Sequence, residues 1–213
     1  MNSLRLAFIF LLISFQCSSQ TDPKAQEILK GVSAKYKSYK SLVAGFKLNL
    51  LDKKTNKSQI QTGTVTIKGN MYNLTMADQQ VMCDGKVNWT YMKESNEVQI
   101  SEVETKSDAL SPTTIFTMYE KGFKTKFIGE KSIGGNYMQL IELYPEDNKK
   151  NYFKVLISIS KKDKYVNSAK VFDKNGNIYT YSITKFTPNA IVTDNLFVFD
   201  KKKFPGVEVV DLR

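Results

Sequence analysis

Four carboxylate side chains are the first residues of this sequence that could do chemistry, because two suitably separated carboxylates can hydrolyse glycosidic bonds by acid–base catalysis. They are Glu102, Glu142, Asp173 and Asp194. Their spacing along the chain singles out no pair, and scattered carboxylates are usually solvated surface charges. A secreted hydrolase is therefore the weakest of the functional interpretations.

Composition limits other catalytic and metal-binding chemistry. The sequence contains no histidine, which excludes Ser-His and Cys-His catalytic pairs and histidine metal sites. No loop carries the acidic spacing of a calcium site. Cys83 is the one cysteine beyond residue 19, so it has no partner for an internal disulfide, and its setting predicts a buried, unreactive thiol. We expect no catalytic residue, no metal and no cofactor.

Residues 1–19 have the layout of a secretory signal peptide, with Arg5 before a short apolar run and the small residues Cys17 and Ser19 before a predicted cleavage ahead of Gln20. The apolar run is about half of the ~20 residues that a membrane-spanning helix needs. The alternative is a lipoprotein signal with a lipidated Cys17, although Gln16 is larger than the residue normally found there. We expect a secreted chain with the signal peptide removed.

The chain is basic, with a formal net charge of +10. Removal of Arg5 with residues 1–19 takes away one positive charge and leaves +9. The lysines are spread along the chain apart from small clusters at residues 161–164 and 201–203. Two interpretations stay open: solubility and protection of edge strands, or attraction to an acidic partner or an anionic membrane surface.

An amphipathic helix is predicted over residues 23–40, where Asp22 can cap the first turn and Pro23 suits the first helical position. From Leu42 onward the apolar period changes from 3.6 to 2, which is typical of β-strands. Turn-forming pairs separate the runs, and Lys-Asn-Gly-Asn at residues 174–177 predicts a hairpin. We expect about ten or eleven antiparallel strands.

The strand pattern is interrupted once, at residues 111–120, where Pro112 and a group of apolar residues predict a short helix. No linker, repeat or low-complexity tract divides the rest, so residues 20–213 are predicted to form one domain. A sheet of this size curls, because a flat one leaves two large faces uncovered. The predicted fold class is mainly β: an open, unclosed antiparallel β-barrel with the N-terminal helix and the short inserted helix as a lid.

The interior of such a barrel is wider than side chains alone fill, so it either packs around the helices or admits an apolar ligand. The residues expected to line it are rich in aromatics and methionine, which adapt to flexible apolar ligands. They are Phe46, Leu48, Leu50, Val65, Ile67, Tyr72, Leu74, Met76, Val87, Trp89, Tyr91, Ile115, Phe116, Met118, Tyr119, Phe197 and Phe199.

Several motifs occur in a recognisable order. A small residue and Phe lie within residues 42–47, and residues 63–68 form a run that starts with Gly and ends with Lys. A hairpin motif follows, made of Asp84, Gly85, Lys86, Trp89 and Tyr91, and the tail adds residues 195–199 and 204–211. In order and spacing these motifs resemble the LolA family of periplasmic carriers of outer-membrane lipoproteins. The resemblance covers most of residues 24–211.

The resemblance implies a periplasmic carrier that is not an enzyme. It would bind the acyl chains of lipoproteins or related lipids, receive them from an inner-membrane lipoprotein-releasing transporter and pass them to an outer-membrane acceptor. We expect a monomer that binds no nucleic acid. Many members of the family have Arg-Pro where this chain has Lys68-Gly69, and lysine lacks the planar donor pattern of arginine, so the lid-fastening role of that arginine is not assigned to Lys68.

Two other classes of binding protein stay open. One is a periplasmic protein that binds a different hydrophobic ligand. The other is a surface module whose aromatics and lysines bind a glycan or single-stranded nucleic acid, although secretion argues against nucleic acid. The direction in which the aromatic side chains face discriminates between them.

Overall fold

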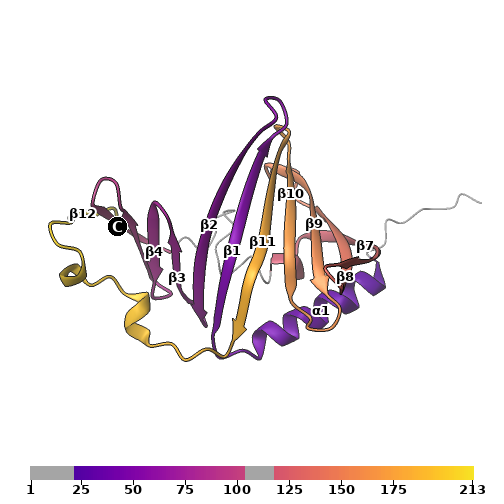
Figure 1. Ribbon diagram of the computed structural model, residues 1–213, viewed down its shortest axis with the longest axis horizontal. Coiled ribbons are helices and arrows are strands. Elements are labelled where there is room, and N and C mark those ends of the chain that lie inside the picture. The colour runs from indigo at the N-terminus through magenta and orange to yellow at the C-terminus, as the bar shows by residue number, and fades with distance from the viewer. Residues whose placement is uncertain (1–21, 104–117) are drawn as a thin grey trace, which may run out of the picture.

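A computed structural model of the chain describes residues 22–103 and 118–213. Within these ranges it contains one α-helix, twelve strands and three short 3-10 helices (Figure 1). In chain order they are α1 (Pro23–Lys37), β1 (Leu42–Asp52), β2 (Lys57–Lys68), β3 (Met71–Met76), β4 (Gln79–Cys83), β5 (Val87–Met92), β6 (Glu97–Glu102), η1 (Met118–Glu120), β7 (Phe123–Ile133), β8 (Asn136–Pro145), β9 (Tyr152–Ser160), β10 (Val166–Asp173), β11 (Asn177–Pro188), η2 (Asp194–Phe197), η3 (Lys201–Lys203) and β12 (Glu208–Asp211).

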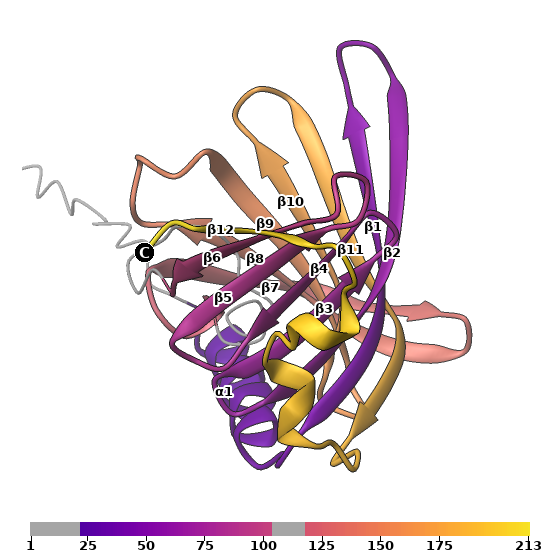
Figure 2. The ribbon, with the colours of Figure 1, turned by 90° about the vertical axis from the view of Figure 1, so that its left-hand side faces the viewer.

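The strands form one sheet in the order β12-β6-β5-β4-β3-β2-β1-β11-β10-β9-β8-β7. The predicted fold class is confirmed, because β7 and β12 lie at opposite edges of a curled sheet that does not close (Figures 1 and 2). The described strands number twelve, above the predicted ten or eleven. The parallel pairing of β12 with β6 departs from the predicted antiparallel arrangement. A parallel pair needs no hairpin turn between its strands, so no local signal indicates it.

The predicted turns lie between strands where the sequence placed them. Gly85, between β4 and β5, has a φ of +93°, and Gly176, between β10 and β11, has a φ of +95°. Glycine suits both positions because other L-residues rarely adopt positive φ. At the second turn the backbone N–H of Asn175 donates to the side chain of Asp173. These turns fix the antiparallel register of the hairpins that they join.

Helix α1 begins at the predicted residue and ends at Lys37, three residues before the predicted end. Its buried stripe packs on the concave face of the sheet, over the half that runs from β7 to β11 (Figure 2). Ile141, Val155 and Ile157 are buried there against the helix. Near the end of the helix, the Tyr36 ring meets Phe186 of β11 edge to face at 5.9 Å. The main hydrophobic core therefore lies between α1 and the concave face.

The opposite, convex face of β3–β6 is covered by residues 189–207, which we call the C-terminal strap (Figure 2). Its η2 helix packs against β3 and β4. Phe197 at the end of η2 is fully buried, and Phe204 packs on the ring of Tyr91 with a centroid distance of 4.5 Å. The sheet is thus covered on one face by α1 and on the other by the strap.

Asp22 connects the helix to the edge of the sheet. Its Oδ1 accepts hydrogen bonds from the backbone N–H groups of Lys24 and Ala25, and its Oδ2 accepts one from Phe127 of β7 at 2.9 Å. Asp22→Ala is expected to lower the thermal unfolding midpoint by a few degrees. The substitution removes the helix cap and leaves the backbone N–H of Phe127, on the edge strand β7, without its acceptor. Asp22→Asn separates the two effects, since asparagine caps well but its NH₂ group cannot accept from Phe127.

The same contact makes stability depend on pH. The hydrogen bond from the backbone N–H of Phe127, opposed in part by desolvation, lowers the pKa of Asp22. A carboxyl whose folded-state pKa is lowered stabilises the fold fully above its ordinary pKa of about 3.9 and loses that contribution as pH falls through the folded-state value. The difference in midpoint between wild type and Asp22→Ala should therefore be complete near neutral pH and shrink below about pH 4. A constant difference across this range would contradict the assignment.

Candidate ligand-binding groove

The set of apolar side chains on the concave face continues from the area that α1 covers on β11 onto β1–β3. Residues paired across antiparallel strands share a face, and the register places Leu48 opposite Tyr181 on β11 and Val65 opposite both Ala44 and Leu74. We define the concave groove as the half-buried apolar residues of this set. They are Phe46, Leu48, Leu50, Ile67, Leu74, Met76, Tyr179, Tyr181 and Ile183.

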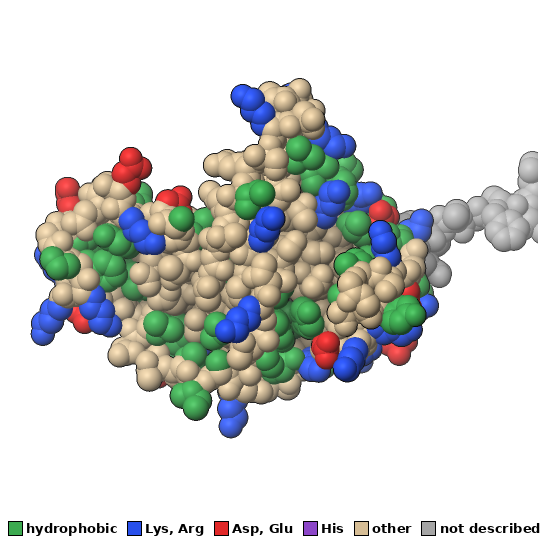
Figure 3. All heavy atoms as spheres, viewed as in Figure 1, with side chains coloured by type: hydrophobic (Ala, Val, Ile, Leu, Met, Phe, Trp, Pro, Cys, Tyr) green, Lys and Arg blue, Asp and Glu red, His purple; other side chains and the backbone are tan. Residues whose placement is uncertain are grey.

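The convex face of the same strands is different in character. Thr62 and Thr64 of β2 and Asn49 of β1 alternate with the groove residues and so lie on the convex side. Figure 3 shows few charged side chains over β1, β2 and β11, with isolated lysines and scattered hydrophobic side chains. Ile60 of β2, which pairs with Asn49, is one exposed hydrophobic residue of this face. One face of the central strands is therefore suited to water and the other to an apolar ligand.

Two hollows lie on the concave face. The first has a volume of about 400 Å³ and lies at the ends of β9–β11, where Tyr152, Tyr179 and Tyr181 contribute to its lining. The second, of about 380 Å³, lies between α1, η1 and the start of β7, where Tyr119, Phe123 and Thr125 contribute to its lining. The Phe123 and Tyr152 rings stack with centroids 6.4 Å apart, so one aromatic pair links the linings of the two hollows.

The structure brings together many of the predicted lining residues. Eight of them lie on the concave side of β1–β3: Phe46, Leu48, Leu50, Val65, Ile67, Tyr72, Leu74 and Met76. Tyr119 joins the core beneath α1. Ile115 and Phe116 lie outside the described residues, as do the signal peptide and most of the predicted inserted helix, of which the structure describes η1. Met118 belongs to η1. Contact of these residues with a lipid stays a prediction.

The predicted inward orientation of Val87, Trp89 and Tyr91 is wrong. Cys83 pairs with Asn88, and Met82 pairs with Trp89, so the three apolar residues of β5 face the convex side. The alternation of apolar and polar residues along β5 is as predicted, but its apolar side packs toward the C-terminal strap. Asn88 faces the concave side, where it accepts a hydrogen bond from Tyr72 at 2.8 Å.

Phe197 and Phe199 require the same correction. Phe197 is buried in η2, which packs on β3 and β4, and the Phe199 ring contacts Phe204 with a centroid distance of 5.1 Å. Phe204 in turn packs on Tyr91. These aromatics fasten the strap to the convex face and do not line the groove.

The sequence interpretation also missed groove residues. Tyr179, Tyr181 and Ile183 lie on β11 beside Leu50, Leu48 and Phe46 in the pairing register. Their own period-2 alternation within residues 178–186 was the signal that could have identified them. No local signal in the sequence indicates that β11 pairs with β1, because β1 lies near the other end of the chain.

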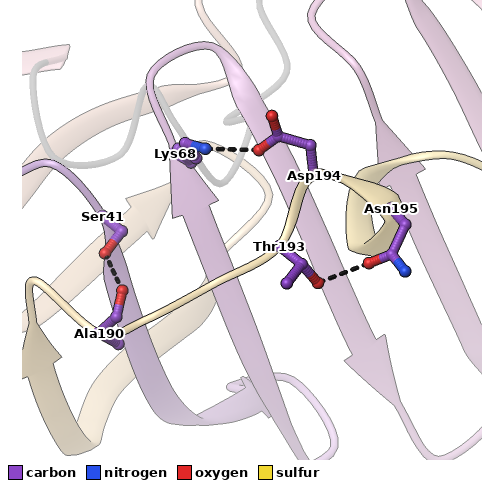
Figure 4. A network of polar contacts seen from close by, with 6 residues as sticks. All are labelled: Ser41, Lys68, Ala190, Thr193, Asp194 and Asn195. Carbon is purple, nitrogen blue, oxygen red and sulfur yellow. Dashed lines mark hydrogen bonds and ion pairs between the residues drawn. The ribbon is translucent and has the colours of Figure 1, made fainter.

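Polar contacts fasten the start of the strap to the sheet (Figure 4). The Ser41 hydroxyl donates to the Ala190 carbonyl at 2.5 Å. Lys68 Nζ lies 2.5 Å from Asp194 Oδ1, and within the strap Thr193 donates to Asn195. The Lys68–Asp194 pair is exposed, and exposed pairs contribute little stability. Lys68 therefore contacts the strap, and its geometry gives no support for a role in holding a lid.

The carboxylates considered for hydrolysis do not converge. Glu142 accepts from Lys154 Nζ at 2.9 Å and from Tyr144, and Asp194 pairs with Lys68. Across residues 22–103 and 118–213, no three acidic or cysteine side chains are grouped to hold a metal ion. Cys83 is buried, as predicted, and burial raises its pKa. Burial also raises the pKa of Tyr72, to about 12, so both side chains stay neutral at physiological pH.

Gly63 makes room for a groove residue. A Cβ atom added at Gly63 would lie 2.6 Å from the Phe46 ring and 2.6 Å from the backbone carbonyl oxygen of Thr75. Gly63→Ala is therefore expected to lower the free energy of unfolding by about 1–3 kcal/mol through overpacking. Gly31→Ala is the control, because nothing lies within 4 Å of that added Cβ, and it should stabilise helix α1 by about 0.5–1 kcal/mol. Chemical denaturation measures both; equal effects would contradict the packing.

In the described part of the chain, no helix is both long enough and apolar enough to cross a membrane.

Comparison with known proteins identifies the family. A family model described as "Outer membrane lipoprotein carrier protein LolA" matches residues 37–200, which is more than half of the chain. The chain belongs to the LolA family. The resemblance inferred from the motif order is thereby confirmed.

Individual relatives give less information about this chain than the family model does. An uncharacterized protein of Methanocaldococcus jannaschii, MJ0687, is 26% identical over 201 residues, which are 90% of this chain and 56% of that protein. The chain thus spans little more than half of that relative. The structure of an uncharacterized conserved protein from Thermus thermophilus matches at a TM-score of 0.60 and 12% identity, with 88% of this chain and 99% of that one covered. MucB matches at a TM-score of 0.51 and 10% identity, with 89% of this chain and 66% of that one covered. Both structures show a shared fold alone.

Proposed function

We propose that the protein is a periplasmic carrier that holds the acyl chains of a lipoprotein or a related lipid in the concave groove. The observation that carries this proposal is the half-buried apolar surface of β1–β3 and β11, which belongs to a LolA-family sheet and adjoins the hollow at the ends of β9–β11. An acyl chain transferred from water gains about 0.8 kcal/mol per buried CH₂, so a groove of this kind can give useful affinity without any polar contact.

The geometry favours reversible holding. Groove residues include Phe46 and Met76, which are half-buried and so keep freedom to repack, and methionine and aromatic linings accommodate flexible apolar ligands. The proposed role needs no catalytic residue, and the dispersed carboxylates support that part of the proposal. We also propose that residues 1–19 are a signal peptide that is removed before Gln20. Residues 20–213 would then form one carrier domain that acts as a monomer.

The partners proposed from family membership are an inner-membrane transporter that releases lipoproteins and an outer-membrane acceptor. The basic net charge, +10 for the whole chain and +9 without Arg5, supports approach to an acidic partner or an anionic membrane surface. A protein that binds a different hydrophobic ligand would use the same groove, so the chemistry of the occupant decides between the two roles.

Native mass spectrometry of the full-length gene product, purified without detergent from the cells that naturally make it, tests the proposal. We expect a mass increase of one acylated lipid or lipopeptide per chain, which extraction then identifies. A bound hydrophobic molecule without an acyl chain would favour the alternative ligand. Recovery of folded protein that never carries an adduct, even after incubation with acylated peptide, would contradict the proposal.

A further inference from the structure

The hollow between α1, η1 and β7 is lined by lysine and glutamine side chains, and the groove residues include neither type. Gln26, Lys30 and Ser33 occupy one face of α1 and line it, facing Tyr119 and Thr125. Leu29 and Phe123 supply apolar walls. The hollow is therefore amphiphilic, because α1 and β7 each contribute both polar and apolar side chains to its lining.

Two hydroxyls in this hollow are buried without a partner. Tyr119 is 4% exposed and Thr125 is 7% exposed, and neither Tyr119 Oη nor Thr125 Oγ1 has a hydrogen-bond partner among the residues that the structure describes. Burial raises the pKa of Tyr119, and the nearby Ser33 hydroxyl opposes part of that effect. Ser33 donates its own hydrogen to Glu120, so it does not donate to the Tyr119 oxygen. Leaving a buried polar group unsatisfied is costly, so a ligand in this hollow that accepts hydrogen bonds would satisfy donors that the described residues leave unpaired.

The charges around the hollow favour an anion. Its charged lining residues are Lys30, Lys37 and Glu120, a sum of +1. Glu120 is already engaged, because Lys37 Nζ lies 2.8 Å from its Oε1 and Ser33 donates to the same carboxylate. Lys30 and Gln26 are exposed on the same helical face. The groups left to meet a ligand are therefore mainly donors: an ammonium, an amide and two hydroxyls.

We propose that this hollow binds the anionic, oxygen-rich headgroup of the cargo lipid, a phosphate or a carboxylate, while the acyl chain lies in the concave groove. The inference rests on the proposed function for the acyl chain and adds the class of headgroup. The stacked Phe123 and Tyr152 rings connect the linings of the two hollows, so an amphiphile can pass from the hollow beneath α1 toward Tyr179 and Tyr181 over apolar side chains. A volume of about 380 Å³ accommodates a glycerol phosphate group.

The test measures the affinity of three probes by isothermal titration calorimetry. The probes are monopalmitoyl glycerol phosphate, monopalmitoyl glycerol, and glycerol phosphate without an acyl chain. The wild type should bind the phosphorylated lipid at least about tenfold more tightly than the uncharged lipid, because charge-assisted hydrogen bonds are strong. Tyr119→Phe, Thr125→Val and Lys30→Gln should each reduce that preference several-fold. Lys30→Gln, at a residue outside the predicted acyl-chain lining, should leave the affinity for monopalmitoyl glycerol unchanged. Tyr179→Phe, in the other hollow, is the matched control and should keep the preference.

The possible results separate the two proposals. If the wild type binds neither palmitoyl compound, the proposed carrier function fails. If it binds both equally and the variants change nothing, the carrier function stands and the headgroup site is overturned. Binding of glycerol phosphate as tight as that of the phosphorylated lipid would assign the hollow to a free anion instead.

Thermal unfolding of the ligand-free protein gives an independent readout. Tyr119→Phe and Thr125→Val should raise the midpoint, because each removes a hydroxyl that is buried without a partner. A lower midpoint in both variants would mean that the hydroxyls already have partners in the resting protein, and it would overturn the headgroup site.

Discussion

Replacing Phe197 with alanine is expected to lower the free energy of unfolding by about 3–5 kcal/mol. Phe197 is fully buried at the end of η2, where the C-terminal strap packs on the convex face of β3 and β4. Removing the ring leaves a cavity lined by residues that cannot collapse easily, because both the strap and the sheet are held by other contacts. One of these is the hydrogen bond from Asn73 Nδ2 to the Leu196 carbonyl, at 2.6 Å.

Leu196→Ala is the matched control for Phe197→Ala, since Leu196 precedes it in the same short helix but is 39% exposed. Its substitution should cost less than about 1 kcal/mol. Urea denaturation followed by tryptophan fluorescence measures both variants, and Trp89, the single tryptophan, lies on the same convex face as the strap. Similar losses from the two substitutions would show that Phe197 does not fasten the strap.

Leu48→Glu is expected to weaken binding of a 16-carbon fatty acid at least about tenfold, because an unpaired charge in the groove must lose water when the acyl chain covers it. Leu48 lies on the concave side of β1 beside Tyr181 and is half-buried in the ligand-free protein. The charged side chain therefore keeps solvent until ligand arrives, and the fold itself should be little affected. Competition with a fluorescent fatty acid measures the affinity.

Leu51→Glu provides the control on the same strand. Leu51 is also half-buried, but it pairs with Ile178 and Ser58 and lies on the convex side of β1. Its substitution should leave the affinity within about twofold of wild type. Equal losses in the two variants would indicate a general effect on the fold, and unchanged binding in Leu48→Glu would remove β1 from the site.

The fold was predictable where the determining signals are local. Asp22 and Pro23 mark the start of α1, and glycines mark the turns at Gly85 and Gly176, because capping and positive φ depend on a few neighbouring residues. The parallel pairing of β12 with β6 depends on a contact between distant segments. Nothing in the short β12 sequence specifies that partner.

The candidate site was predictable in its chemistry and less so in its geometry. The alternation of Trp89 and Tyr91 with polar residues correctly indicates a strand with one apolar face. Which way that face points is decided by what covers it, and here the strap supplies Phe197 and Phe204 on the convex side. A period of two carries no information on the direction, so the inward assignment of these aromatics failed.

The hollow beneath α1 could not be read from the sequence at all. Tyr119 and Thr125 look like ordinary members of apolar and alternating runs. What distinguishes them is that their hydroxyls are buried, have no hydrogen-bond partner among the described residues, and line the same hollow as Lys30. That arrangement depends on how α1 crosses the sheet. Packing of this kind joins residues from separate elements and leaves no local pattern.

Photocrosslinking with a 16-carbon fatty acid that carries a diazirine near its methyl end tests the central claim most directly. Light activation of the complex, followed by peptide mass spectrometry, locates the acyl chain on the protein. We predict crosslinks to groove residues of β1, β3 and β11, such as Leu48, Leu74 and Tyr181, that are competed away by unlabelled acylated peptide. Crosslinks confined to the convex face around Thr64 and Asn49, or none in folded protein, would contradict the proposal that the concave groove shelters an acyl chain.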